Sequence, residues 1–488
     1  MNSSQDRRAV CWSNVTFSYS ENPKRNTLEN VDVSVSAEKF TVITGPSGCG
    51  KSSLLYLGAG LYPANGGFLR GGNVTVDGAT PASLKPEDRA MLLCMMFQNP
   101  DLQFCMDTVE HELIFCMENI SLPVEEMDSR LLEALEFCEI SHLRHRLIST
   151  LSGGEKQRVM LACAMVIKPK WLLLDEPFAN IDEESAATLI SKLKKLHEDF
   201  GTGILAVDHN PWLWKSVADE LIVLSTDGSL LERNIDLKNA SPEKLSELGI
   251  SCPAFPYQTE KPSKNKSCKT ALKISGLSLK KGENEIFRGL NAEFEAGKIH
   301  AILGKSGCGK STLFGALCGI EKYGGSILIG GKELKSINKK ELGGTMGFVF
   351  QNPQDQFVSD TVLEEISVSL KTSKDKNESR EAKAILEEIG LWRHRNLSPY
   401  MLSQGQQRRL GTAALLCYKC GILICDEPTY AQDRKNVLAI MDELQRRVVN
   451  DGLTLIFSTH DSLLAESYAD KIYYMREGKL FEKDKSHL

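Results

Sequence analysis

Two glycine-rich segments of the sequence have the composition and spacing of phosphate-binding loops. They run from Gly45 to Ser52 and from Gly304 to Ser311, and both fit G-x-x-x-x-G-K-[ST]. In this Walker A pattern, backbone amides surround phosphate oxygens, the lysine contacts the β- and γ-phosphates, and the hydroxyl binds Mg²⁺. The sequence therefore predicts two sites for ATP and Mg²⁺.

The predicted nucleotide contacts follow from the order of residues in each loop. We assign Lys51 and Lys310 to the γ-phosphate, Ser52 and Ser311 to magnesium, and Ser53 and Thr312 to the α-phosphate. The other loop residues predicted to line the nucleotide are Gly45, Ser47, Gly48, Cys49, Gly50, Gly304, Ser306, Gly307, Cys308 and Gly309. The two cysteines offer only their backbone there, which favours packing over thiol regulation.

An Asp-Glu pair follows an apolar run in each half of the chain. Asp175-Glu176 comes after Trp171 to Leu174, and Asp426-Glu427 comes after Ile422 to Cys425. The aspartates can hold Mg²⁺, and the next carboxylate can polarise an attacking water. Acidic residues at a strand end can also simply cap the next helix. Their position behind a phosphate loop favours catalysis.

A third motif combines glycine with a helix-capping pattern. It reads Leu151-Ser152-Gly153-Gly154-Glu155 in the first half and Leu402-Ser403-Gln404-Gly405-Gln406 in the second. Ser-x-x-Glu and Ser-x-x-Gln predict capped helix starts, and a helix N-terminus flanked by glycine is an anion site. The alternative is a capped helix with no ligand.

All three motifs occur twice in the same order, the second time about 250 residues further along, a period too long for solenoid units. We therefore predict two domains, 1–238 and 271–488. The intervening segment 239–270 is rich in Pro, Ser, Lys and Asn and lacks apolar periodicity, which predicts a linker.

Short apolar runs alternate with helical patterns in both halves. The expected buried parallel strands are Phe40 to Thr44, Trp171 to Leu174, Thr202 to Val207, Ile299 to Leu303, Ile422 to Cys425 and Thr454 to Ser458. This alternation predicts an α/β fold with a mainly parallel sheet, whose ligands gather at the carboxyl ends of the strands.

Composition excludes several classes of protein. The net charge of −6 argues against a partner with a phosphate backbone. The best apolar stretch, Leu410 to Cys425, is too short to span a bilayer and contains Lys419, and the polar N-terminus lacks a signal-type segment. The 14 cysteines are too sparse for a disulfide scaffold, and Cys417 and Cys420 form an isolated C-x-x-C, so free thiols in the cytosol are expected.

The motif set resembles that of the nucleotide-binding domains of ATP-binding cassette (ABC) proteins, twice over. The resemblance implies a P-loop NTPase fold with a RecA-like sheet core, an N-terminal antiparallel β subdomain and a helical subdomain. It also implies that the two halves pair head to tail, with Ser403, Gln404 and Gly405 facing the ATP on Lys51. Ser152, Gly153 and Gly154 would then face the ATP on Lys310.

The resemblance assigns further residues to each site. His209 and His460 would contact the γ-phosphate, and Gln98 and Gln351 would sense magnesium and water. Asp182 and Asp433 follow the Asp-Glu motifs and would border the nucleotide. Tyr19 matches the aromatic that stacks on adenine, although an edge-strand aromatic is the alternative, and Lys281 aligns with it in the second half. Loss of that stacking contact predicts two hydrolysing sites of unequal affinity.

Two segments point to the partner. Phe97 to Phe104 and Phe350 to Phe357 resemble the F-Q-N-P-x-x-Q-F segment of the energy-coupling factor (ECF) branch, which imports vitamins and transition-metal ions. The resemblance implies an ATP-hydrolysing importer subunit on the cytoplasmic face of the membrane. Its partners would be a separate transmembrane coupling protein and a substrate-binding membrane protein, and two chains could associate further.

The alternative is a tandem cassette that acts on ribosomes or nucleic acid. Translation-factor members usually have a long charged linker, and this one is short and contains proline. Repair members need zinc-type cysteine pairs, and the ribosome-recycling type needs an N-terminal iron–sulfur cysteine cluster, where only Cys11 occurs. The importer is therefore favoured, with no nucleic-acid partner.

Overall fold

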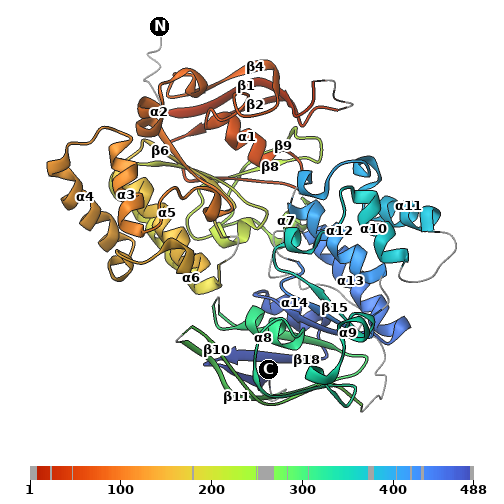
Figure 1. The fold of residues 1–488 in the computed structure, drawn as a ribbon. Coiled ribbons are helices and arrows are strands. Elements are labelled where there is room, and N and C mark those ends of the chain that lie inside the picture. Colours follow the sequence, from red (N-terminus) through yellow and green to blue (C-terminus); the bar gives the residue numbers. More distant parts are fainter. Residues whose placement is uncertain are drawn as a thin grey trace, which may run out of the picture. The chain divides into compact units, whose positions relative to one another are not determined.

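The computed structural model describes residues 8–483 except 22, 24, 47, 179, 180, 249, 251–268, 283, 306, 372–377, 403, 418, 419 and 430–433. The chain divides into two compact units, Met1–Ala254 and Phe255–Leu488 (Figure 1). Most of the predicted linker, 251–268, lies outside the described residues. The start of the predicted linker is described, and it belongs to the first unit, since Leu245 and Ile250 are buried in the core of that unit. The fold of that unit therefore continues past residue 238, through a helix too short to show periodicity.

The first unit is built on a six-stranded sheet in the order β5-β6-β7-β3-β8-β9. All neighbours are parallel except β8 and β9, which are antiparallel. The strands are β3 (Thr41–Thr44), β5 (Leu93–Met96), β6 (Trp171–Asp175), β7 (Gly203–Val207), β8 (Glu220–Leu224) and β9 (Leu230–Ile235).

An antiparallel sheet and the helices complete this unit. The sheet has the order β2-β1-β4 and contains β1 (Ala9–Ser18), β2 (Leu28–Ser36) and β4 (Phe68–Val76). Figure 1 shows α3, α4 and α5 grouped at one side of the unit. The helices are α1 (Lys51–Gly58), α2 (Pro86–Leu92), α3 (Val109–Glu118), α4 (Val124–Phe137), α5 (Gly153–Ile167), α6 (Glu183–Phe200) and α7 (Pro242–Glu247).

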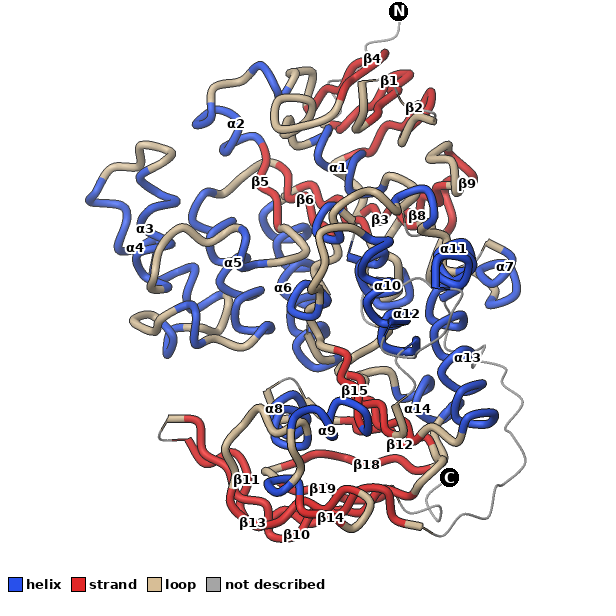
Figure 2. Tube along the Cα trace, turned by 45° about the vertical axis from the view of Figure 1, so that its right-hand side comes forward, coloured by secondary structure: helices blue, strands red, loops and turns tan. Residues whose placement is uncertain are grey.

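The second unit repeats this plan. Its six-stranded sheet has the order β15-β16-β17-β12-β18-β19, and its antiparallel sheet, at the bottom of Figure 2, has the order β11-β10-β13-β14. The strands are β10 (Thr270–Lys281), β11 (Asn284–Glu295), β12 (Ile299–Leu303), β13 (Gly324–Ile329), β14 (Lys332–Glu333), β15 (Met346–Val349), β16 (Ile422–Cys425), β17 (Thr454–Ser458), β18 (Lys471–Arg476) and β19 (Lys479–Glu482). The helices are α8 (Lys310–Leu317), α9 (Lys339–Thr345), α10 (Val362–Lys371), α11 (Glu378–Glu388), α12 (Gln404–Cys417), α13 (Arg434–Asp451) and α14 (Ser462–Tyr468).

The central strands are apolar along their whole length because both faces of each sheet are covered. In β7, Ile204 and Ala206 belong to the core under the helices, whereas Leu205 and Val207 belong to the core under the antiparallel sheet. Such two-sided burial produces continuous apolar runs instead of alternation. The six predicted strands are confirmed to within one residue at either end, as are the α/β class and both subdomains.

Candidate ATP-binding and hydrolysis sites

The first phosphate loop connects β3 to α1. Gly50 ends it in the left-handed region at φ 100°, where a Cβ would lie 2.6 Å from Cδ2 of Leu28, so a side chain there is excluded. Lys51 is buried and its Nζ donates to the carbonyl oxygens of Gly45 at 2.8 Å and Pro46 at 3.2 Å. The ammonium thus lies across the loop that is predicted to hold phosphate.

The second loop, between β12 and α8, has the same construction. Nζ of Lys310 donates to the carbonyl oxygens of Gly304 at 2.7 Å and Lys305 at 3.2 Å. It also lies 3.5 Å from Nε2 of His460 and 4.0 Å from Oε1 of Glu427. Three residues that were predicted separately for the second site, Lys310, His460 and Glu427, thus lie side by side. The predicted contacts Ser47 and Ser306 lie outside the described residues.

Each predicted magnesium pair consists of a hydroxyl next to a buried carboxylate. In the first unit, Oγ of Ser52 donates to Oδ1 of Asp175 at 2.8 Å, and the hydroxyl of Tyr56 donates to Oδ2 at 2.9 Å. In the second, Asp426 accepts hydrogen bonds from Ser311 and Ser458. These are oxygen donors of the kind that Mg²⁺ prefers, so the residues fit the ion.

Burial acts on these aspartates before any cation is present. Burial, followed by the charge of Glu176, raises the pKa of Asp175 to about 7, although the bonds from Ser52 and Tyr56 oppose the shift. Burial likewise raises the pKa of Asp426. A divalent cation would favour the ionised form of both carboxylates. Tyr56 was missed from the sequence, since a tyrosine one turn into a helix carries no motif.

The predicted catalytic glutamates are held by two of the predicted partners. Oε2 of Glu176 accepts a hydrogen bond from Nε2 of Gln98 at 2.9 Å and lies 3.4 Å from Nδ1 of His209. Both glutamates have left-handed backbones, with φ 44° at Glu176 and φ 50° at Glu427. Such conformations cost about 1–3 kcal/mol and cluster at functional sites.

In the second unit, Oε1 of Glu427 lies 2.7 Å from Nε2 of His460. Burial would raise the pKa of Glu427, but the bond and charge of His460, together with Lys310 and Arg408, hold it below its usual value. This carboxylate is therefore ionised at neutral pH and can accept a proton. No described side-chain hydrogen bond links Gln351 to Glu427, in contrast to the Gln98–Glu176 pair.

His209 provides a test of this electrostatic arrangement. Burial would lower the pKa of His209, but the negative charge of Glu176 at 3.4 Å, together with that of Asp208, outweighs it and raises the pKa to about 9. A raised pKa in the folded state contributes stability that is complete below the unfolded value of about 6.5 and is lost as pH rises through 9. Urea unfolding of the nucleotide-free chain should therefore show the first unit of the wild type losing stability relative to His209→Gln between pH 6.5 and 9.5. A difference that stays constant over that range would contradict the pairing.

The predicted adenine positions differ between the units. Tyr19 is 54% exposed, packs edge-on against Phe17 and Tyr62, and its hydroxyl lies 2.7 Å from Oγ of Ser53. At the aligned position, Nζ of Lys281 pairs with Oε1 of Glu321 at 2.9 Å. The first unit thus presents an open aromatic ring where the second presents an ion pair.

The first signature segment starts a capped helix, as expected. Ser152 and Glu155 form a capping box at the start of α5. A Cβ on Gly154 would lie 2.7 Å from Oγ of Ser185, whose amide donates to Asp182 at 2.9 Å, so this segment packs against the start of α6. Ser403 and Asp433 lie outside the described residues, as does the side chain of Gln404.

Sequence reasoning missed one residue of the second signature helix. Arg408 is buried and its guanidinium donates to the carbonyl oxygens of both Glu427 and Gln351. The matching residue in α5 is Gln157, which is also buried and whose amide atoms have no partner among the described residues. The sequence feature that could have revealed this residue is the change from glutamine in the first signature helix to arginine in the second, since the two helices are otherwise similar.

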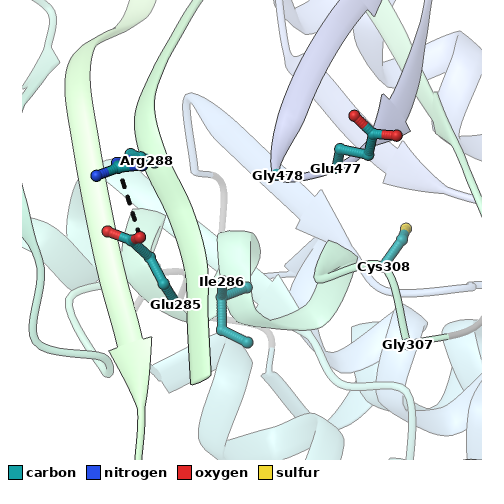
Figure 3. A pocket seen from close by; sticks show the side chains of 7 residues that line it. All are labelled: Glu285, Ile286, Arg288, Gly307, Cys308, Glu477 and Gly478. Carbon is teal, nitrogen blue, oxygen red and sulfur yellow. Dashed lines mark ion pairs between the residues drawn. The ribbon is translucent and has the colours of Figure 1, made fainter. Parts of the chain in front are cut away.

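A cavity of about 400 Å³ flanks the phosphate loop of the second unit (Figure 3). Gly307 and Cys308 of the loop line it with Glu477 and Gly478 of the β18–β19 turn, and with Glu285, Ile286 and Arg288 of β11. Burial raises the pKa of the Cys308 thiol, which disfavours the reactive thiolate. The catalytic carboxylates do not line this cavity.

The comparison with known families agrees with this geometry. The sequence pattern described as "ABC transporter" matches residues 28–179 and 287–430, which is more than half of the chain. The chain belongs to the ABC transporter family. It is a tandem ABC ATPase, with one cassette in each unit. None of the described helices of the two cassettes is long and apolar enough to cross a membrane.

Two relatives resemble the tandem cassettes along nearly their whole length. The putative HMP/thiamine import ATP-binding protein YkoD of Bacillus subtilis is 33% identical, over 95% of this chain and 89% of its own. A putative ABC transporter ATP-binding protein of Methanosarcina acetivorans is 31% identical, over 93% and 82%.

Solved structures also share the tandem architecture. A model of ribosome-bound archaeal Pelota and ABCE1 aligns with a TM-score of 0.69 at 20% identity, over 96% of this chain and 77% of that one. The archaeal ribosome recycling factor aABCE1, in complex with the stalk protein aP1, gives 0.64 at 21%, over 96% and 89%. At such identities the likeness concerns the fold alone.

Proposed function

We propose that this ABC ATPase is the energy-coupling subunit of an ECF-type importer, working with separate transmembrane subunits at the cytoplasmic face of the membrane. The name of the YkoD relative supports a vitamin as cargo. The observation that carries the proposal is a pair of loops, one in each unit, that follow Gln98 and Gln351. They are built alike and expose apolar side chains.

A buried glutamate fixes each loop. Oε2 of Glu112 in α3 accepts hydrogen bonds from the amides of Cys105 at 2.9 Å and Met106 at 2.7 Å. Glu365 in α10 does the same for the amides of Val358 at 3.0 Å and Ser359 at 2.9 Å. Both carboxylates are buried. Because they accept hydrogen bonds from backbone amides, they hold each loop by its main chain.

The loops keep large apolar side chains in water. Leu102 is 80% exposed in the short 3-10 turn after Gln98. In the loop of the second unit the exposed apolar residue is Val358, at 77%, which aligns with Cys105 and not with Leu102. Single exposed apolar residues are ordinary on a surface. Here exposed apolar residues occur in both loops, and the first loop follows Gln98, which donates to the catalytic Glu176. This arrangement supports docking of a membrane partner.

We propose that the two nucleotide sites form head to tail between the cassettes. Lys51 and Lys310 hold the phosphates, and Glu176 and Glu427 accept a proton from the attacking water. Mg²⁺, when bound, neutralises phosphate charge, and Ser52, Asp175, Ser311 and Asp426 would hold it with Gln98 and Gln351. ATP binding then favours a closed state of the two cassettes, and hydrolysis lets them reopen. The affinities for nucleotide and for the membrane partner are therefore coupled in both directions.

Charged substitutions in the loops test this proposal. Leu102→Glu combined with Val358→Glu should abolish co-purification with small hydrophobic membrane subunits, because a carboxylate would be buried at the interface. Leu231→Glu changes a residue that is 55% exposed on β9 and is the matched control, which should still co-purify. Recovery of the wild type with ribosomes or nucleic acid, and without membrane subunits, would overturn the proposal in favour of a soluble tandem cassette.

A further inference from the structure

A cluster of thiols and one carboxylate lies inside the helical subdomain of the first unit, on helices that do not carry its phosphate loop. Glu112 and Cys116 are one turn apart on α3, so they share a face, and Cys163 comes from α5. One donor atom from each of the three lies within 4.8 Å of the others. Glu112 and Cys163 are buried, and Cys116 is half-buried.

The carboxylate has one oxygen to spare. Both amide hydrogen bonds to Glu112 fall on Oε2, and no described residue donates to Oε1. The amides therefore fix the direction of the carboxylate, as hydrogen bonds to a metal ligand commonly do. One of the two amides belongs to Cys105, whose side chain is exposed and whose thiol lies outside the 4.8 Å group.

We propose that Cys116, Cys163 and Glu112 bind a zinc-class divalent cation, with the thiol of Cys105 as fourth ligand. Tetrahedral Zn²⁺ has sulfur ligands at about 2.3 Å and oxygen ligands at about 2.0–2.2 Å, which sets neighbouring donors about 3.4–3.8 Å apart. The donor atoms of Cys116, Cys163 and Glu112 lie up to 4.8 Å apart, so they must approach one another by about 1 Å to bind the ion. Side-chain rotation can supply that movement.

The donor set indicates the class of metal. Three sulfurs and one oxygen favour a borderline-soft cation over Mg²⁺ or Ca²⁺, which prefer oxygen alone. The hydrogen bond with Cys116 and burial raise the pKa of Cys163 well above its ordinary value. Cysteine binds a metal ion as the thiolate, so binding releases protons and tightens as pH rises.

The second unit has no thiol at the two positions that match Cys116 and Cys163, so it supplies a built-in comparison. Glu365 holds its loop by two amide hydrogen bonds, as Glu112 does, but one turn later α10 has Ser369 in place of Cys116. Along α12, counted from the signature glycine, Ala414 stands in place of Cys163. Holding the loop thus needs only the glutamate, and the two thiols of the first unit are extra.

Metal titration of the full chain tests the proposal. The reduced, chelator-stripped protein is titrated with Zn²⁺ against a chromophoric chelator, and with Co²⁺, whose absorption reports thiolate ligands and tetrahedral geometry. We expect one ion per chain. The double substitution Cys116→Ser, Cys163→Ala introduces the residues that the second unit has at these positions. It should lower the affinity for the metal by at least about 100-fold and remove the thiolate absorption band, since half of the proposed ligands are lost.

Three controls separate this site from other thiols. Cys417→Ser with Cys420→Ser removes the C-x-x-C pair and should leave binding unchanged. Glu112→Gln should weaken binding by about 10-fold or more, whereas Glu365→Gln should not. Absence of micromolar binding by the wild type would overturn the proposal. So would an unchanged band in the Cys116→Ser, Cys163→Ala chain, or loss of the ion in the C-x-x-C variant.

Discussion

Replacement of Glu176 or of Glu427 by glutamine will each lower steady-state ATP turnover by about 10²- to 10⁴-fold, the usual contribution of a general base. Both carboxylates follow a buried aspartate, adopt left-handed backbones and pair with a histidine. Glutamine has nearly the same shape but cannot accept the proton. Nucleotide binding should persist in both variants, because neither side chain belongs to the phosphate loop.

The matched control is Glu87→Gln, which changes an exposed glutamate in the first turn of α2 and should keep wild-type turnover. Phosphate release is measured at saturating ATP for each chain. Unaltered turnover in Glu427→Gln beside abolished turnover in Glu176→Gln would contradict two hydrolysing sites. The second site would then be regulatory.

The phosphate loops and the sheet were predictable because their residues are contiguous. Lys51 and Ser52 open a helix that follows an apolar strand after six intervening residues, so one short segment determines both the loop and its charge. The carboxyl ends of parallel strands meet at one sheet edge, which is why Asp175 and His209 could be expected beside that loop.

Contacts between segments distant in sequence were not predictable. Arg408 donates to the carbonyl oxygen of Gln351, which is 57 positions away in the chain. Tyr56 and Cys163 likewise gain their neighbours from helix packing. The early part of the predicted linker appeared irregular because α7 is too short for periodicity to show.

The second large effect concerns which lysine works with which signature serine. We expect Lys51→Ala to weaken nucleotide binding at one site by about 10- to 150-fold, since charge-assisted hydrogen bonds are worth about 1.5–3 kcal/mol. Ser152→Arg and Ser403→Arg place a bulky side chain at the two signature positions. Removal of the cap at Ser152 costs only about 1 kcal/mol, so the helix should still form.

Counting the ATP molecules held by the Glu176→Gln, Glu427→Gln chain, with these substitutions added in pairs, tests the shared-site account most directly. We predict two ATP for the parent and one for Lys51→Ala. The count should stay at one when Ser403→Arg is added and fall to zero when Ser152→Arg is added. The opposite result, zero with Ser403→Arg and one with Ser152→Arg, would show that each cassette completes its own site, and would contradict the account.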